Sequence, residues 1–352
     1  MNGKYHVIEF GCKELLIVLV GGFFGDEGKG KIGAYLSLAD KPKYAVRTGS
    51  INAGHTVYYE GKVYKLRSVP SGFVSPTTTL LIAPGALVRL DVLMNELRDF
   101  RINDRTFLDF NTGIIEKEHV EREKNDSMLT SIGSTFQGVG AAMSDRVLRR
   151  LRLARDVDEL RGMLIDVPGA VRRALEMGDE VLVEGTQGTF LSLYHGTYPY
   201  VTSRDTTASG ILSEVGIGPK DADEVLIVFK SFITRVGEGP LEGEMAKEEI
   251  EKLGLVEKGT VTGRMRRVAP FNIDLAKRAV MLNSATQAAI TKLDWIFKEA
   301  HGINKWSALP NEARRWVEDI ENQIKVPITL IGTGEDVMHV IDRRKDLGVN
   351  QW

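Results

Sequence analysis

Cysteine, long apolar runs and net charge are all scarce in this chain of 352 residues. The one cysteine, Cys12, excludes an intrachain disulfide and is typical of a reducing compartment. No apolar run reaches the roughly 18 residues that are needed to span a bilayer. The first fourteen residues also lack the apolar stretch of a signal peptide. We therefore expect a cytoplasmic protein in which residues 1–14 form an N-terminal extension.

The balance of charge argues against broad electrostatic partners. The 46 basic and 48 acidic residues give a net charge of −2, so we expect no general binding to nucleic acid or to a membrane surface. With 43% hydrophobic residues, a chain of this length can bury a large core. No repeat of fixed period, low-complexity tract or Pro/Ser-rich linker interrupts the sequence. We expect residues 15–352 to form a single domain with small appended subdomains.

Short apolar runs alternate with amphipathic segments along the chain. Residues 15–22, LLIVLVGG, predict a buried parallel strand, and residues 29–39 predict a helix. Residues 57–66 predict a hairpin that turns at residues 60–62. The other predicted strands are 78–88, 106–110, 180–185, 224–232, 287–294 and 326–334, and the other predicted helices are 89–100, 169–178, 247–254, 272–285 and 310–324.

Two further segments are distinguished by their charge. Residues 116–126, EKEHVEREKND, predict a solvated and mobile segment. Residues 144–164 predict a basic amphipathic helix that contains a candidate break. Taken with the strands and helices above, the pattern predicts an α/β fold with a mostly parallel central sheet flanked by helices.

The glycine-rich segment GGFFGDEGKGK, residues 21–31, follows the first strand and opens the first helix. Backbone N–H groups and a positive helix end then meet at one place, which favours phosphate binding. The segment departs from the P-loop pattern G-x-x-x-x-G-K-[ST], because Lys29 is followed by Gly30. The hydroxyl that would bind Mg²⁺ is therefore missing. Asp26 could serve as a metal ligand, as a base or as both, and an ordinary glycine-rich turn is the alternative.

Two loops carry groups suited to proton transfer and to a nucleobase. NAGHT, residues 52–56, contains His55, which can transfer a proton or hydrogen-bond a phosphate; local packing is the alternative role. Residues 184–203 follow a predicted strand, where α/β proteins bind ligands. Gln187 can both donate to and accept from a purine edge, although a polar surface loop is an equal alternative. For His195 in the same segment we favour a structural role.

Two segments near the C-terminal half suit anions and guanine. KGTVTGRMRR, residues 258–267, holds three arginines within four residues; guanidinium groups bind carboxylates and phosphates, and a solvated basic loop is the alternative. TKLD, residues 291–294, resembles the guanine-recognition motif N-K-x-D with threonine in place of asparagine. A capping aspartate at a strand end is the more frequent explanation of such a motif. IGTG, residues 331–334, offers further backbone amides.

In this order along the chain, the segments GDEGKGK, NAGHT, EGTQGTFL, HGTYPYVTS, TRVGEGP, TGRMRR and TKLD resemble the adenylosuccinate synthetase family. The resemblance runs from residue 21 to about residue 336, close to the whole chain. It implies a P-loop-NTPase-like fold and a ligase of the AMP branch of purine biosynthesis. Such a ligase uses GTP and Mg²⁺ to join L-aspartate to IMP, through 6-phosphoryl-IMP.

The resemblance implies a role for each catalytic residue. Asp26 would take the proton from N1 of IMP and bind Mg²⁺ together with the carbonyl of Gly54. His55 would act as a proton donor towards the GTP phosphates. Lys29 would neutralise developing charge, and Gln187 would contact O6 of IMP.

The resemblance also implies three sets of binding residues. The GTP set is Gly25, Asp26, Glu27, Gly28, Lys29, Gly30, Lys31, Gly54, His55, Thr56, Arg266, Lys292, Leu293, Asp294, Gly332, Thr333 and Gly334. The IMP set is Asp26, Glu27, Gly28, Lys29, Asn52, Ala53, Gly54, His55, Thr135, Arg149, Gln187, Thr202 and Arg264. The aspartate set is Thr260, Val261, Thr262, Gly263, Arg264, Met265 and Arg266. Arg149 would reach the active site of the neighbouring subunit in a homodimer.

The chain departs from the family pattern in one loop. Many relatives have Thr-Gly-Arg-Gly-Ile-Gly-Pro where this sequence has Thr135 followed by FQGVGA, so Gln137 replaces an arginine next to the implied IMP site. The chain is also shorter than most members and resembles the compact, archaeal-type form.

Two other functions stay open at this point. A GTP-binding switch or regulatory protein would suit the glycine-rich loop and TKLD, but it would not require Asp26, His55 and the arginine loop together. The weaker alternative is a nucleotide-dependent ligase for another amino acid.

Overall fold

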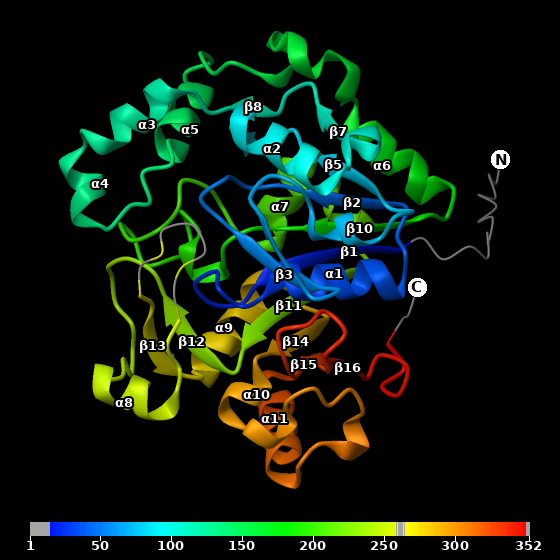
Figure 1. Ribbon diagram of the computed structural model, residues 1–352, viewed down its shortest axis with the longest axis vertical. Coiled ribbons are helices and arrows are strands. Elements are labelled where there is room, and N and C mark those ends of the chain that lie inside the picture. The colour runs from blue at the N-terminus through cyan, green and yellow to red at the C-terminus, as the bar shows by residue number, and fades with distance from the viewer. Residues whose placement is uncertain (1–14, 258, 260–262, 264, 350–352) are drawn as a thin grey trace, which may run out of the picture.

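The computed structural model describes residues 15–349 apart from residues 258, 260–262 and 264. Its centre is a sheet in which ten strands of the described chain lie side by side, with helices packed around it (Figure 1). All neighbouring strands pair in parallel except the last two at one edge, which are antiparallel. The predicted α/β fold with a mostly parallel central sheet is therefore confirmed.

The strands form one large sheet and three small two-stranded sheets over the described residues. The main sheet runs in the spatial order β16 (Val340–Asp342), β15 (Ile328–Gly332), β14 (Gln287–Thr291), β11 (Glu224–Lys230), β1 (Leu15–Gly21), β10 (Glu180–Glu184), β2 (Tyr44–Arg47), β5 (Thr79–Ile82), β7 (Thr106–Asp109) and β9 (Leu164–Ile165). Three small sheets pair β3 (His55–Tyr59) with β4 (Lys62–Leu66), β6 (Leu87–Val88) with β8 (Gly113–Ile114), and β12 (Phe232–Arg235) with β13 (Arg267–Pro270).

The helices of the described chain are mostly short. The α-helices are α1 (Lys29–Ala39), α2 (Leu90–Phe100), α3 (Lys117–Lys124), α4 (Ser127–Ser131), α5 (Val139–Val147), α6 (Val167–Glu176), α7 (Ala208–Val215), α8 (Lys247–Leu253), α9 (Ile273–Asn283), α10 (Leu293–Ile296) and α11 (Asn311–Ile324). Single 3-10 turns occur at Ser71–Val74, Asn103–Arg105, Ala154–Asp156, Asp158–Met163, Thr189–Leu191, Pro219–Asp221, Lys298–Ala300 and Trp306–Ala308. Over the described residues, no helix has the length and apolarity to cross a membrane.

Alternating residues of β1 hold two layers of helices on the sheet. Leu15, Ile17 and Leu19 share a buried cluster with the apolar face of α1. The intervening residues 16, 18 and 20 share another buried cluster with α6, α7, α9 and α11. Because successive strand side chains point to opposite faces, an unbroken apolar run is required at this central position. The sequence LLIVLV meets that requirement.

Several predicted elements end earlier than expected. The strand predicted over 287–294 stops at Thr291, because Lys292 has a φ of 57° and α10 follows at once. The helix predicted over 144–164 is wrong. Helix α5 ends at Val147, and Arg149 has a φ of 63°, which no continuing helix allows.

The charged segment 116–126 was predicted to be solvated and mobile; most of its residues are exposed, as predicted, but it forms helix α3, which was not predicted. The Glu123 carboxylate is buried and accepts hydrogen bonds from the backbone N–H of Gly138 (2.7 Å) and Gly140 (2.6 Å). His119 is also buried, and its Nε2 lies 3.2 Å from Asp145. Two of the charged and polar residues thus fasten the segment to α5, which a high density of charge in the sequence does not indicate.

The carboxyl ends of the parallel strands bring the loops with the candidate site residues to one end of the sheet. The loops after β1, β2, β10 and β14 contain residues 22–28, 48–54, 185–207 and 292 onward. Helices α3, α4 and α5 lie on the same side of the molecule as the β12–β13 hairpin and α8, on the left of Figure 1. This edge is the place where open parallel sheets bind ligands.

A buried arginine anchors the C-terminal segment to helix α1. The guanidinium of Arg344, 2% exposed, donates to Asp40 (2.6 and 3.1 Å) and to Asp342 (2.6 and 3.1 Å). Asp40 caps the C-terminal end of α1, and Asp342 ends β16. The network therefore fixes the helix whose N-terminus holds the glycine-rich loop.

We expect Arg344→Met to lower the free energy of unfolding by about 3 kcal/mol, because it leaves two partly buried carboxylates, Asp40 and Asp342, without their cation. Denaturation in urea measures the change. The matched control is Arg161→Met, whose pair with Asp158 is exposed (76% and 82%), and whose loss should cost less than about 1 kcal/mol. Equal losses in the two variants would contradict this account of the C-terminal anchor.

Candidate active site

The glycine-rich loop is held in shape by its own glutamate. Glu27 is buried, and its Oε1 accepts hydrogen bonds from the backbone N–H of Phe23 (2.9 Å) and Gly25 (2.8 Å). Lys29, 1% exposed, donates to Glu27 Oε2 (3.1 Å) and to the Gly25 carbonyl (3.3 Å). Gly28 caps the helix with a φ of 87°, in the left-handed region that favours glycine. The loop therefore presents a fixed lysine and a helix N-terminus.

The position after Lys29 is glycine because His55 packs directly against it. A Cβ at Gly30 would lie 2.7 Å from the Cβ of His55, too close for any side chain. The serine or threonine of an ordinary P-loop cannot fit there. The hydroxyl is therefore missing at position 30 because His55 occupies the space that a side chain there would need.

Asp26 is paired with an arginine from a distant part of the chain. Arg266 Nη2 lies 2.8 Å from Asp26 Oδ1. The other oxygen, Oδ2, is buried, and no described residue donates a hydrogen bond to it. A buried carboxylate oxygen without a donor is costly unless a proton or a cation comes to it.

His55 is oriented by a buried carboxylate. Its Nδ1 lies 2.5 Å from Glu184 Oε1, at the end of β10. Arg47 donates to the same carboxylate oxygen (3.1 Å) and to the Ala53 carbonyl (3.1 Å). Burial and then the Arg47 guanidinium lower the pKa of His55 to about 4. The imidazole is therefore neutral at pH 7, and the described residues leave its buried Nε2 without a partner.

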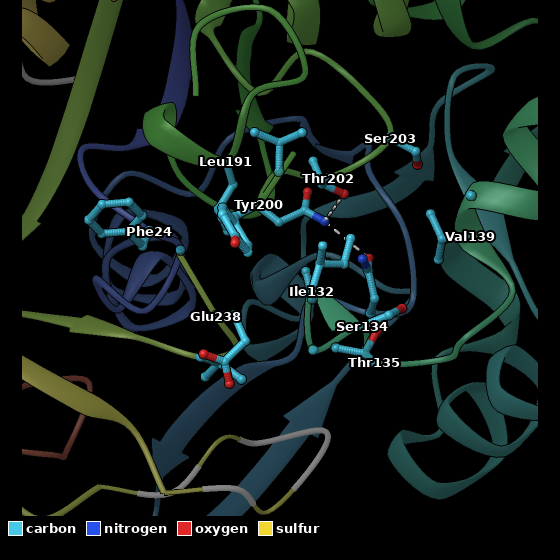
Figure 2. Close-up of a pocket in the computed structure, with 18 of the residues that line it drawn as sticks. Phe24, Ile132, Ser134, Thr135, Val139, Leu191, Tyr200, Thr202, Ser203 and Glu238 are labelled. Carbon is cyan, nitrogen blue, oxygen red and sulfur yellow. Dashed lines mark hydrogen bonds between the residues drawn. The ribbon is translucent and has the colours of Figure 1, made fainter. Parts of the chain in front are cut away.

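A cavity of about 390 Å³ opens beside these groups. Its lining includes nine of the predicted site residues: Gly25, Asp26, Asn52, Ala53, Gly54, Thr135, Gln187, Thr202 and Arg266. Figure 2 shows Tyr200 and Thr202 from the loop after β10 around the same space as Ile132 and Thr135 from the α4–α5 connection. Segments far apart in the sequence thus form one wall.

Gln187 ties two of the lining residues together. Its Nε2 donates to Asn52 Oδ1 (3.1 Å) and to Thr202 Oγ1 (3.1 Å), and its Oε1 accepts from Thr186 (2.9 Å). Its φ of 59° is unusual for a residue other than glycine and turns the side chain into this network. Both N–H groups of the Gln187 amide already donate, so a ligand that accepts from one of them must displace Asn52 or Thr202.

The predicted guanine end lies on the other side of the glycine-rich loop. Thr291, in the place of the motif's asparagine, donates to the Glu27 carbonyl (2.6 Å) and so joins TKLD to the loop. Asp294 has one oxygen 3.0 Å from His301 Nδ1, while no described residue donates to its buried Oδ1. Lys292 lies 4.0 Å above the Trp295 ring. An unpaired carboxylate oxygen beside a strand end can accept the N–H groups of a base.

The remaining predicted GTP residues lie on β3, α1, α10, the end of β15 and the segment that follows it. A Cβ at Gly332 would lie 3.1 Å from Lys31 Cε, so the end of β15 packs against α1. Lys31 donates to the Asp336 carbonyl, and burial lowers its pKa to about 8. Thr333 is buried and donates to the Ile303 carbonyl (2.6 Å). The residues of this set that remain are Thr56 on β3, Leu293 buried in α10, and Gly334 against His339.

Some predicted residues are not brought to this cavity. Arg149 is exposed and lines a different cavity with Arg146 and Arg155. Gly263 and Met265 are exposed. Thr260, Val261, Thr262 and Arg264 fall outside the described residues. His195 does not line the cavity.

Several residues of the site escaped sequence analysis. Glu184 and Arg47 end neighbouring strands, and only their pairing across the sheet reveals the contact with His55. Arg235, 1% exposed, lines the cavity 4.5 Å from the Phe24 ring. Lys230 is the last residue of β11 and reaches the buried Glu257 (3.0 Å). All four are charged residues that end a largely apolar strand, and this was the available signal for them.

The residues present fit a hard divalent cation. Magnesium prefers carboxylate and carbonyl oxygens and keeps several waters. Asp26 and Gly54 both line the cavity, and Asp26 Oδ2 is the buried oxygen without a donor from the described residues. In the described chain no group of three His, Cys, Asp or Glu side chains forms a metal cluster, so a cation here would depend on backbone, water and substrate oxygens.

Known proteins resemble this chain over most of its length. The adenylosuccinate synthetase family matches residues 18–159 and 151–299. The adenylosuccinate synthetase of Methanococcus aeolicus is 50% identical, covering 93% of this chain and 99% of the relative. That of Archaeoglobus fulgidus is 48% identical, covering 94% and 98%.

Solved structures agree with the sequence relatives. The fully ligated adenylosuccinate synthetase from Plasmodium falciparum has a TM-score of 0.87 and 25% identity, covering 94% of this chain and 100% of that one. The cyanophage S-2L succinoaminodeoxyadenylate synthetase, bound to dGMP and dATP, has a TM-score of 0.78 and 26% identity over 95% and 97% of the two chains. This chain belongs to the adenylosuccinate synthetase family of ligases.

Proposed function

We propose that the cavity beside the glycine-rich loop joins IMP to L-aspartate at the expense of GTP, giving adenylosuccinate, GDP and phosphate. The observation that carries the proposal is the position of Asp26. Its side chain belongs to the phosphate-binding loop and also lines the cavity that holds Asn52 and Gln187. One carboxylate can therefore act on a purine in the cavity and on a phosphate at the loop. The names of the relatives support the same reaction.

The first step forms a 6-phosphoryl intermediate. Asp26 takes the proton from N1 of IMP, which makes O6 nucleophilic. O6 then attacks the γ-phosphorus of GTP, and the bond to the β,γ-bridging oxygen breaks so that GDP leaves. Such phosphoryl transfers depend on positioning and on neutralising charge. Lys29, fixed by Glu27, supplies one positive charge at the loop.

A bound Mg²⁺ would neutralise phosphate charge, and Asp26 with the Gly54 carbonyl would hold it. His55 then has a defined task. Its Nδ1 is turned to Glu184, so Nε2 is the atom left for the phosphates. The negative charge of GTP would raise the low pKa of the imidazole and place a proton on Nε2. His55 thus becomes the proton donor towards the phosphates only when they are bound.

The second step replaces phosphate with the amino acid. The amine of L-aspartate attacks C6 of the purine, and the C6–O bond to the phosphate breaks. The carboxylates of the amino acid need cations beside the cavity. Residues 260–266 would supply them, with Arg264 also reaching IMP and Arg266 reaching GTP. Arg266 lies beside Asp26, and this contact supports a role for Arg266 close to the reacting atoms.

IMP would be held through its phosphate and its base. Asn52, Thr135 and Thr202 carry short polar side chains on the cavity wall and would bind the 5′-phosphate. Gln187 would contact O6 after giving up one of its two donated hydrogen bonds. At the other end, Asp294 and the stem of Lys292 would bind guanine.

We also propose a homodimer with shared active sites. Arg149 is exposed and outside its own chain's active-site cavity, and two exposed apolar residues precede it, Val147 (72%) and Leu148 (51%). An arginine beside exposed apolar side chains is typical of a protein interface. Arg149 would reach IMP in the partner's cavity.

The reaction is tested by a product assay that omits IMP, L-aspartate, GTP or Mg²⁺ in turn. We expect adenylosuccinate and phosphate only in the complete mixture. Phosphate release that proceeds equally without IMP and aspartate would favour a GTP-binding switch.

Asp26→Asn should lower kcat by about 10³-fold, inside the range for a lost general base, while calorimetry still detects IMP binding. The matched control is Asp99→Asn, whose side chain is 58% exposed on helix α2, and it should keep normal turnover. Normal turnover in Asp26→Asn itself would remove Asp26 from the mechanism.

Mixing two inactive variants tests the shared site. Asp26→Asn and Arg149→Leu should each be nearly inactive alone. After the two are mixed and allowed to exchange subunits, half of the dimers carry one intact site, so about one quarter of normal activity should return. A mixture that stays inactive, although exchange is verified by mass, would show that each site is built from one chain.

A further inference from the structure

A buried carboxylate, Glu257, lies where the two ends of the site meet. It is 6% exposed and precedes the implied aspartate-binding segment. Its Oε2 accepts from Lys230 Nζ (3.0 Å) and Arg266 Nη1 (2.6 Å), and its Oε1 contacts Lys292 Nζ. No role for Glu257 is predicted from the sequence.

The three cations come from different parts of the site. Lys292 follows β14 and covers the guanine end, and Arg266 holds Asp26 with its second nitrogen (2.8 Å). Lys230 ends β11 and is also held by Thr234 and by the Phe232 ring (4.7 Å). Glu257 therefore contacts Lys292 at the guanine end and Arg266, which in turn contacts Asp26.

The three contacts are unequal in strength. Burial lowers the pKa of Lys230 to about 7, whereas an arginine keeps its charge in proteins. A guanidinium can also bind both oxygens of a carboxylate at once, which adds strength and direction. Arg266 uses only one nitrogen on Glu257 and its other terminal nitrogen on Asp26, while Lys292 contacts the second oxygen of Glu257.

We propose that Glu257 is a positioning residue that couples guanine binding at Lys292 to the release of Asp26 by Arg266. When guanine draws Lys292 away, Oε1 of Glu257 becomes free to accept Arg266 Nη2. The guanidinium then pairs with Glu257 through both nitrogens, and Asp26 Oδ1 is freed for the purine. The inference rests on the proposed roles of Lys292 and Asp26 in the ligase reaction.

The coupling must be reciprocal, as any linkage between two binding sites is. GDP carries the guanine base and binds without turnover, so it is the probe for one end. IMP is the probe for the other end, because its N1 must reach Asp26. We therefore expect GDP to strengthen IMP binding by about tenfold, within the usual range of such coupling.

Calorimetry measures the affinity for IMP with and without saturating GDP. In Glu257→Gln, which keeps the shape of the side chain but loses its charge, we expect the two IMP affinities to agree within about twofold. Lys292→Met removes the cation that contacts Glu257 Oε1, so GDP should no longer change the affinity for IMP. This variant keeps the test valid if Glu257→Gln folds poorly. The midpoint temperatures of thermal unfolding of both variants, compared with that of the wild type, show whether they are folded.

The matched control is Glu244→Gln. Glu244 pairs with the next arginine along the chain, Arg267, but at the surface (38% and 28% exposed). It should keep the full coupling of the wild type.

The outcomes separate this inference from the proposed reaction. Coupling that persists in Glu257→Gln or in Lys292→Met, or that is missing from the wild type, overturns the role of Glu257. If the wild type binds neither IMP nor GDP, the proposed reaction itself fails, and this would be seen before any variant is made.

Discussion

The ion pair between Asp26 and Arg266 is the contact on which the active site depends. A carboxylate within a phosphate-binding loop repels the phosphates it is placed beside, and its burial adds a desolvation cost. Such a residue is tolerated only if each stage of the reaction offers it a positive partner. Arg266 is that partner in the structure, and a purine proton or a divalent cation would take its place in the reaction. The negative charge of Asp26 is thus already compensated by Arg266 before any substrate binds.

The glycine-rich loop departs from the common P-loop, and packing explains each departure. Gly30 leaves room for His55, whose neutral ring is held by Glu184. Thr291 replaces an asparagine and ties the guanine motif to the loop through Glu27. Both changes bring a second segment into contact with the loop. The loop therefore lacks the hydroxyl group that would bind a metal in an ordinary P-loop, and the imidazole of His55 lies beside it instead.

The part of the site that follows from local sequence was predictable, and the part that depends on distant pairing was not. Asp26 and Gln187 follow apolar strands, and parallel strands bring such residues to one edge of the sheet. The partner of Asp26 depends on the β12–β13 hairpin, which no short pattern announces because 31 residues separate its strands. The two buried residues of the charged helix α3, His119 and Glu123, were not predicted for the same reason. Glu123 can be buried because its carboxylate accepts hydrogen bonds from the backbone N–H groups of residues 138 and 140.

Gln137 stands where the family resemblance implies an arginine, and the contacts around it limit the effect of that difference. Gln137 carries no charge, but its Oε1 accepts a hydrogen bond from Arg67, whose Nε donates to the Ile51 carbonyl (2.8 Å). Ile51 precedes Asn52 on the cavity wall, so a guanidinium still lies beside this part of the site. Because electrostatic attraction depends on where a charge lies and not on which strand supplies it, the end of β4 can provide what the α4–α5 connection lacks.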